Sequence, residues 1–147
     1  MKFYRLTPAF FQDYCPSCPE ILKKPTRPHY VFVLTMRNLT FAVPLRSKLP
    51  SDGRYSFVAD QGDAGLDFTK AVVITDRQRY VTSKAIQIRQ HEFNMLKQNE
   101  FVVARRFEQF LNSYIKQIQR QQKNPNIPQP KWCTYSSLQY FHKELGL

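Results

Sequence analysis

The stretch HYVFVLTMRNLTFAVP, residues 29–44, decides the fold class of this chain. Its two halves, 29–36 and 39–44, are rich in β-branched and aromatic residues, which favour strands. The dipeptide Arg37-Asn38 between them is typical of a tight turn. The stretch therefore predicts an antiparallel hairpin, and its unbroken apolar run suggests that the first strand is buried on both faces.

More elements are predicted on both sides of this hairpin. Thr7 and Pro8 are expected to start a short helix, with Thr7 as its N-cap, because proline loses nothing at the first helical position. The Gly- and Asp-rich segment 60–65 is expected to connect two strands. The other predicted strands are residues 2–6, 54–59, 68–75 and the extended segment 80–88.

The second half of the chain is helical in pattern. Apolar residues recur at spacings of three and four from about Asn99-Glu100 to Arg120, which predicts one amphipathic helix. Its apolar stripe comprises Phe101, Val102, Ala104, Phe107, Phe110, Leu111, Tyr114, Ile115 and Ile118.

The chain is predicted to end in a loop and one more helix. Residues 121–131 are rich in Pro, Asn and Gln and read as a surface loop. A helix over 134–145 follows, with Thr134 as N-cap and Gly146 as the stop. The order of elements predicts a single α+β domain over residues 1–147, a twisted antiparallel β-sheet with flanking helices.

The balance of charge indicates a polyanionic partner. The chain of 147 residues has 22 Lys and Arg against 11 Asp and Glu, a formal net charge of +11. Residues 21–51 and 109–143 contain no acid at all. Such tracts focus a positive potential, and nucleic-acid phosphates are its commonest target. The alternative is a solvated basic surface without a specific partner.

Several classes of protein are disfavoured by what the sequence lacks. With only 4 Gly it has neither a dinucleotide-binding G-x-G-x-x-G nor a P-loop. No apolar run reaches the roughly 20 residues of a membrane span, and the N-terminus has no signal-peptide pattern. The 3 Cys argue against a fully paired disulfide framework. We therefore expect a cytoplasmic protein without membrane attachment.

Metal chemistry has one weak candidate. The spacing Cys15-Pro-Ser-Cys18 forms half of a zinc motif, which Cys133 and His142 would have to complete. The alternative is a pair of reduced thiols in a loop, and we expect no metal and no cofactor. A paired-carboxylate site is also disfavoured, because turn chemistry explains the acids of one predicted loop. Those acids are Asp60, Asp63 and Asp67.

RNA cleavage without a metal suits the basic tract best. The ribose 2′-OH is the nucleophile, so the protein must move protons and stabilise a dianionic phosphorane. Arg46 can clamp the phosphate, and Ser47 can donate a further hydrogen bond. Lys48 or Lys70 can transfer the proton if neighbouring cations lower its pKa. His29 is the candidate imidazole, and the alternative for all of these residues is a structural or solvated role.

The remaining cations are candidates for RNA binding. They are Lys23, Lys24, Arg27, Arg37, Arg79, Lys84, Arg105, Lys116 and Arg120. Basic residues spread over two tracts also fit a non-catalytic RNA- or DNA-binding module, which remains the alternative to an enzyme.

Four segments resemble a known family. They are MKFYRLTPAFFQDY (1–14), RPHYVFVL (27–34), FAVPLRS (41–47) and GLDFTKAVVI (65–74). The chain is similar in them to the toxins of type III toxin–antitoxin systems, the ToxN/AbiQ, TenpN and CptN endoribonucleases. The last segment looks closest to the TenpN branch, and the likeness spans most of residues 1–118.

The resemblance implies a Kid/MazF-like fold and a metal-independent endoribonuclease. Its products would carry 2′,3′-cyclic phosphate and 5′-OH ends. Its partners would be substrate mRNA and a small repeated antitoxin RNA with a pseudoknot, which the toxin processes and with which it assembles into a closed protein–RNA complex. The role would be phage defence by abortive infection, or plasmid maintenance, in a bacterial cytoplasm.

The site residues that the resemblance implies match the family only in part. Ser47 falls on the serine of the family's catalytic loop, and Arg46 replaces a threonine. Arg27 falls where the family has a lysine. The family's catalytic lysine corresponds to Leu49 here, so Lys48 or Lys70 is the expected substitute. Substrate RNA would lie along residues 21–51, and the cations of the long helix and of 116–131 would hold the antitoxin, with both RNAs competing for one groove.

Overall fold

The computed structural model describes residues 1–14, 17–23, 29–50, 55–59 and 62–147. In these ranges six strands form one antiparallel sheet, flanked by helices. The strands are β1 (Phe3–Arg5), β2 (Tyr30–Met36), β3 (Leu39–Arg46), β4 (Ser56–Val58), β5 (Gly65–Asp67) and β6 (Val72–Val73). The helices are α1 (Pro8–Tyr14), α2 (Arg77–Tyr80), α3 (Gln90–Gln98), α4 (Glu100–Lys123) and α5 (Lys131–Thr134), with the 3₁₀ turns η2 (Phe68–Lys70) and η3 (Ser137–Phe141).

The predicted hairpin is confirmed. β2 and β3 pair antiparallel from Tyr30 opposite Leu45 to Met36 opposite Leu39. Arg37 and Asn38 form the two-residue turn with φ angles of 55° and 61°, the left-handed pair that matches the twist of a hairpin. The expectation that β2 is buried on both faces holds only at Val31 and Phe32, which point to opposite faces, since the strand's other residues are partly or fully exposed.

The sheet has the order β1-β2-β3-β5-β4, with β6 beside β3. The predicted strand over 68–75 is wrong in its first half, because the chain turns at η2 before entering β6. The Asp67 carboxylate accepts from the Thr69 backbone N–H at 3.0 Å and so caps this turn. The strand at this point is β5, which pairs with both β3 and β4.

The segment over residues 80–88 leads from α2 toward α3 and lies beside β1. It begins at the end of α2 and forms only isolated bridges, Leu6 to Val81 and Phe3 to Ile86. The hydroxyl of Thr7 donates to the carbonyl of Arg79 at 2.6 Å, so it bonds to α2 and does not cap α1 as expected. This contact fixes the start of α1 against α2.

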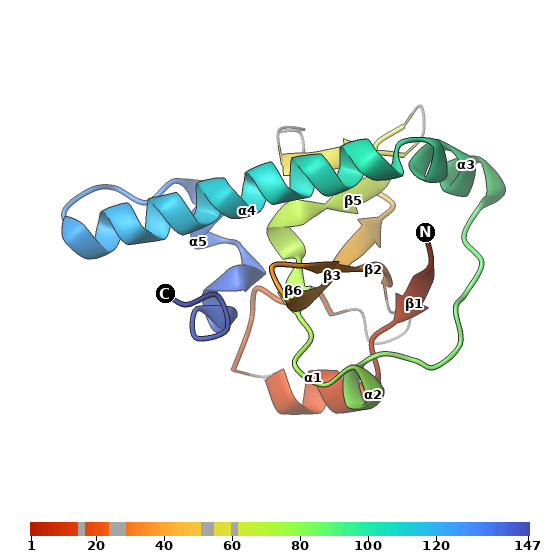
Figure 1. Cartoon of the computed structure of the whole chain (residues 1–147), viewed down its shortest axis with the longest axis horizontal. Coiled ribbons are helices and arrows are strands. Elements are labelled where there is room, and N and C mark those ends of the chain that lie inside the picture. The colour runs from red at the N-terminus through yellow and green to blue at the C-terminus, as the bar shows by residue number, and fades with distance from the viewer. Residues whose placement is uncertain (15–16, 24–28, 51–54, 60–61) are drawn as a thin grey trace.

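The long amphipathic helix is confirmed as α4. Its buried face comprises Val103, Phe107, Phe110, Leu111, Tyr114 and Ile118. The ring of Phe107 packs against Phe41 of β3 and Phe68 of η2, with centroids 5.2 and 5.6 Å apart. Phe101 and Val102 are exposed, contrary to the predicted stripe. Figure 1 shows α4 along one side of the sheet and α1 and α2 at the other.

The predicted helix over 134–145 is wrong. The chain forms α5, a break, and then η3. Ser136 caps η3 by accepting from the Leu138 N–H at 3.2 Å, which breaks the helix that the apolar spacing suggested. The Thr134 hydroxyl instead donates to the side chain of Gln129 at 2.8 Å. Gly146 has a φ of 75° near the chain end, as expected of a helix stop.

A partly buried hydrogen bond ties this C-terminal segment to α4. The Tyr114 hydroxyl lies 2.7 Å from His142 Nε2. Burial raises the pKa of Tyr114 far above its ordinary value and lowers the pKa of His142. The phenol therefore donates and the neutral imidazole accepts.

We expect this bond to make the protein sensitive to acid. The folded state disfavours the charged imidazole, so its contribution to stability is complete above the unfolded pKa of about 6.5 and is lost as the pH falls below it. His142→Gln keeps an acceptor for Tyr114 without a titrating group. Melting temperatures between pH 7.5 and pH 5 should fall further for the wild type than for this variant, and parallel profiles would contradict the assignment.

Candidate functional site

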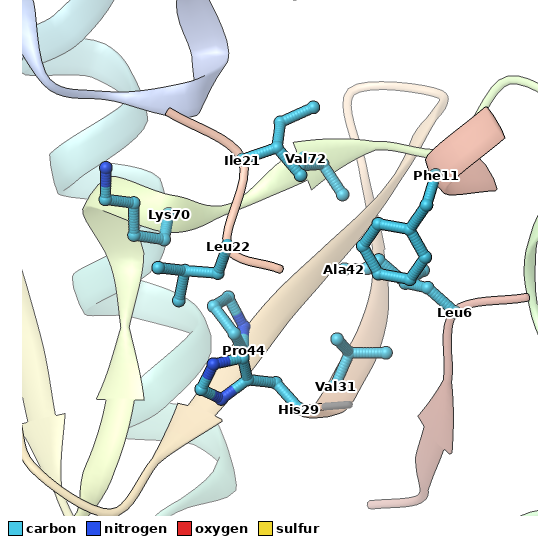
Figure 2. Close-up of a pocket in the computed structure, with 10 residues that line it drawn as sticks. All are labelled: Leu6, Phe11, Ile21, Leu22, His29, Val31, Ala42, Pro44, Lys70 and Val72. Atoms are coloured by element: carbon cyan, nitrogen blue, oxygen red, sulfur yellow. The ribbon is translucent and has the colours of Figure 1, made fainter. Parts of the chain in front are cut away.

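Two faces of the sheet have different neighbours. Phe41 of β3 points to α4. Because successive side chains of a strand point to opposite faces, Ala42 and Pro44 point to the other face of the sheet. That other face carries a pocket lined by Ala42, Pro44 and Val31 (Figure 2). Of the candidate catalytic residues, His29 and Lys70 line this pocket.

The pocket is small and mainly apolar. Its titratable lining residues are His29 and Lys70, and its apolar walls include Leu22 and Val72. A cavity volume of about 20 Å³ gives room for one water molecule. It is therefore too small to enclose a nucleotide base, and any RNA must lie across its mouth.

His29 lies at this end of the hairpin, immediately before β2. Its Nδ1 is 3.4 Å from the carbonyl oxygen of Leu45, a residue of β3. An Nδ1–H that donates to this carbonyl leaves Nε2 as the basic nitrogen of the neutral ring, the form that a general base needs. The side chain is half-buried, so the fold orients the ring without closing it off.

Arg46 is held by a buried carboxylate. Its NH1 donates to Asp67 Oδ2 at 2.7 Å, and the Asp67 side chain is only 2% exposed while that of Arg46 is 26% exposed. The other oxygen of Asp67 accepts from the Thr69 hydroxyl at 2.6 Å as well as from the Thr69 N–H. The guanidinium is thus fixed in direction, with part of the side chain accessible at the surface.

Lys70 is in a different environment from the one expected. Its Nζ donates to Glu20 Oε2 at 2.7 Å, to the Glu20 carbonyl at 3.1 Å and to the Tyr135 carbonyl at 2.8 Å. These three bonds match the three donors of an ammonium group. Figure 2 shows the Lys70 amine directed away from the His29 ring. An anion and two carbonyls surround it, where the sequence argument required neighbouring cations.

We predict that Lys70 contributes mainly to stability. Lys70→Met removes three hydrogen bonds that join η2, the segment around Glu20 and the C-terminal segment. The free energy of unfolding should fall by about 1–3 kcal/mol. Urea titration measures this, and Lys84→Met, at an exposed position, is the matched control. Equal stability of the two variants would show that the three bonds contribute nothing.

Ser47 and Lys48 lie in the turn that follows β3, and both are exposed. Backbone pairing places Tyr30 opposite Leu45, so His29 and Arg46 are the next positions along the two strands. The fold therefore brings His29, Arg46, Ser47 and Lys48 to one end of the hairpin, although His29 is separated from the other three in sequence. Lys70 lines the same pocket, but its amine is directed to Glu20 and to the Tyr135 carbonyl.

The candidate RNA-binding residues divide into three sets. Lys24 and Arg27 lie outside the described residues, as does Cys15 of the zinc alternative. Lys23 and Lys84 are exposed, whereas Arg79 pairs with Asp13 at 3.0 Å, and this pair lowers the pKa of that carboxyl. The third set belongs to the exposed side of α4, where Arg37 of the hairpin turn also reaches. It comprises Arg37, Arg105, Lys116 and Arg120.

Sequence reasoning missed the two carboxylates of the site. Asp67 was expected to serve turn chemistry, which it does, but it also binds Arg46. Glu20 lies just before the acid-free tract and pairs with Lys70. No signal in the sequence joins these pairs, because their partners are 21 and 50 residues apart.

A metal centre finds no support in the described ranges. No group of three or more His, Cys, Asp or Glu side chains there can hold an ion. Cys18 and Cys133 are buried free thiols, and burial raises the pKa of Cys133 to about 11. The zinc alternative stays a prediction, which elemental analysis of the purified chain tests.

No described helix is long and apolar enough to cross a membrane.

No family model, curated protein or solved structure matches this chain. The features that bear on its function are the geometry of the hairpin end, the charge of the chain and the resemblance of its segments.

Proposed function

We propose that this chain is a metal-independent endoribonuclease toxin of a type III toxin–antitoxin system. The observation that carries the proposal is the register of the hairpin, in which four residues that bear an imidazole, a guanidinium, a hydroxyl and an ammonium lie at one end. These groups belong to His29, Arg46, Ser47 and Lys48, on a chain of net charge +11. They are the groups that RNA transesterification needs when no metal takes part.

The proposed reaction has two proton transfers around one displacement. His29 accepts the proton of the ribose 2′-OH, and the 2′ oxygen forms a bond to phosphorus. The bond from phosphorus to the 5′ oxygen breaks, and Lys48 donates a proton to that oxygen. The products are a 2′,3′-cyclic phosphate and a 5′-OH. Arg46 and Ser47 donate hydrogen bonds to the phosphorane oxygens as negative charge develops there.

The wider biology of the proposal comes from the resemblance. It includes the Kid/MazF-like form of the fold, for which the antiparallel sheet with flanking helices is the supporting observation. It also includes an inhibitory repeated RNA, a closed protein–RNA complex and substrate mRNA in a bacterial cytoplasm. Phage defence or plasmid maintenance is the proposed role. The resembling segments 41–47 and 65–74 adjoin in space, since β3 pairs with both β5 and β6.

Expression in bacteria tests the proposal directly. An inducible copy should arrest growth when expressed alone and should be tolerated when the adjacent repeat-containing DNA is expressed with it. Purified protein should cleave RNA in excess EDTA, and the new 5′ ends should accept phosphate from polynucleotide kinase without prior phosphatase treatment. Normal growth together with intact RNA would overturn the proposed function.

A non-catalytic nucleic-acid-binding module is the second candidate. One observation favours it: Arg46 and Lys70 are each paired with a carboxylate, which reduces the positive charge available to a scissile phosphate. This candidate predicts RNA or DNA binding that weakens steeply with salt, without cleavage and without growth arrest. The expression and cleavage assays therefore separate the two.

A further inference from the structure

The outward side of α4 carries an unusual line of cations. The helix has 24 residues and is about 36 Å long. At 3.6 residues per turn, Arg105, Lys116 and Lys123 lie within about 20° of one another around the axis. Arg120 lies about 40–60° from them. All four are exposed, on the side opposite the helix's buried residues.

The hairpin adds a fifth cation to this line. Asn112 lies on the same side of α4, between Arg105 and Lys116, and its side-chain oxygen accepts a hydrogen bond from Arg37 of the β2–β3 turn. The contact brings the guanidinium of Arg37 to the gap between the two helical cations. We call the five residues the α4 ridge: Arg37, Arg105, Lys116, Arg120 and Lys123.

Few acids oppose this charge. None of the ion pairs in the described part of the chain uses a cation of the α4 ridge. α4 itself has two acids, and one of them, Glu100, binds the N-terminal amine at 3.3 Å. The other is Glu108, after which no acid follows until Glu144. Beyond Glu108 the ridge therefore presents a positive potential without an opposing acid on α4, along about four helical turns.

The side chains around these cations favour RNA over a lipid surface. Gln109, Asn112 and Ser113 lie among them and offer hydrogen bonds to phosphate and ribose groups. Phe101, one turn before Arg105, is 78% exposed and presents a flat face on which a base can stack. Membrane-bound helices need a continuous apolar face toward the acyl chains, and the exposed side of α4 has none along its length.

The ridge and the candidate cleavage site lie on opposite sides of the sheet. Phe107 faces Phe41 on one face, while His29 lines the pocket on the other. Figure 1 shows α4 along one side of the sheet, and the helical cations of the ridge lie on the side of α4 opposite its buried residues. An RNA that lies along it does not have to cover His29.

We propose that the α4 ridge is a second RNA-binding surface, which holds a single-stranded segment along the helix while the end of the hairpin stays accessible. The identity of the ligand as RNA rests on the proposed function. The inference replaces one groove for two competing RNAs with two separate surfaces. An RNA held only at the ridge would raise the local concentration of substrate without blocking cleavage.

The test compares two variants with the same change of net charge. The ridge variant is Arg105→Gln, Lys116→Gln, Arg120→Gln and Lys123→Gln. The control variant changes four exposed cations elsewhere, Lys2, Arg77, Arg89 and Lys143, to Gln. The probe is a fluorescent 2′-O-methyl oligonucleotide of about 20 nucleotides, which spans the helix and has no 2′-OH to react.

The ridge variant should bind this probe at least tenfold more weakly than the control variant does. The slope of log Kd against log salt should fall by about 2–3 for the ridge variant. Phe101→Ala should weaken binding about fivefold or more without changing that slope. Both four-site variants should cleave a substrate of about five nucleotides at the wild-type rate, because the hairpin end is untouched.

Equal losses in the two variants, or no binding of the probe by the wild type, would overturn the ridge as an RNA surface. So would ridge-dependent binding to vesicles of phosphatidylserine and phosphatidylcholine without binding to the probe. Because the probe cannot be cleaved, the assay is independent of catalysis. Ridge-dependent binding by a protein that cleaves no RNA would contradict the proposed function but would support the ridge as an RNA-binding surface.

Discussion

His29→Ala should lower the rate of RNA cleavage by about 10²–10⁴-fold, the usual contribution of a general base. The ring lies at the start of β2, next to the β3 carbonyl that orients it. Arg46 and Ser47 would still bind the phosphate, so the loss should appear in kcat more than in KM. Growth arrest on expression should disappear with it.

Three controls make this result interpretable. His91→Ala removes an exposed histidine of α3 and should leave cleavage unchanged. Urea titration of His29→Ala separates catalysis from stability, because His29 also lines the pocket. Lys48→Ala should slow cleavage of ordinary RNA but have less effect on a substrate with a good 5′ leaving group, which needs no acid. Full activity of His29→Ala would remove His29 from the mechanism.

Asp67→Ala should lower the free energy of unfolding by about 3 kcal/mol. Removing one partner of a buried ion pair leaves the other without compensation, and the partial exposure of Arg46 reduces the cost from the upper end of the usual range. The change also removes both hydrogen bonds to Thr69 that cap η2. A loss of this size is a large share of the stability of a small domain.

A double-mutant cycle tests the origin of this effect. Arg46→Met with Asp67→Ala should be more stable than the sum of the two single losses predicts, because neither charge is then left unpaired. Asp63→Ala, at an exposed position nearby in sequence, should change stability by less than about 0.5 kcal/mol. A loss for Asp67→Ala no larger than that for Asp63→Ala would show that the pair does not stabilise the fold.

The parts of the fold that were predictable are those that local patterns determine. The hairpin follows from two apolar runs around Arg37 and Asn38, and the structure has both residues at positive φ. α4 follows from a period that repeats over many turns. Both signals are dominated by neighbours within four residues, so distant contacts did not change them.

The failures have a common physical cause. The strand expected over 68–75 and the helix expected over 134–145 both break where a side chain caps a turn. Asp67 does so for η2 and Ser136 for η3. A single hydrogen bond to a backbone N–H competes there with a weak apolar pattern. Phe101 and Val102 lie more than about 100° around α4 from the centre of its buried face, so they point away from the sheet.

The sequence by itself determined that this chain is strongly basic, that it pairs residues 29–44 as a hairpin, and that its second half is helical. It also placed Arg46, Ser47 and Lys48 together, because they are neighbours. Only the tertiary structure decided that His29 lies beside them and that the α4 cations face away from the site. It also decided that Asp67 forms an ion pair with Arg46 and Glu20 with Lys70. Charge counts are additive along a chain, but the partner of each charge depends on which strands and turns come together, and that is a property of packing.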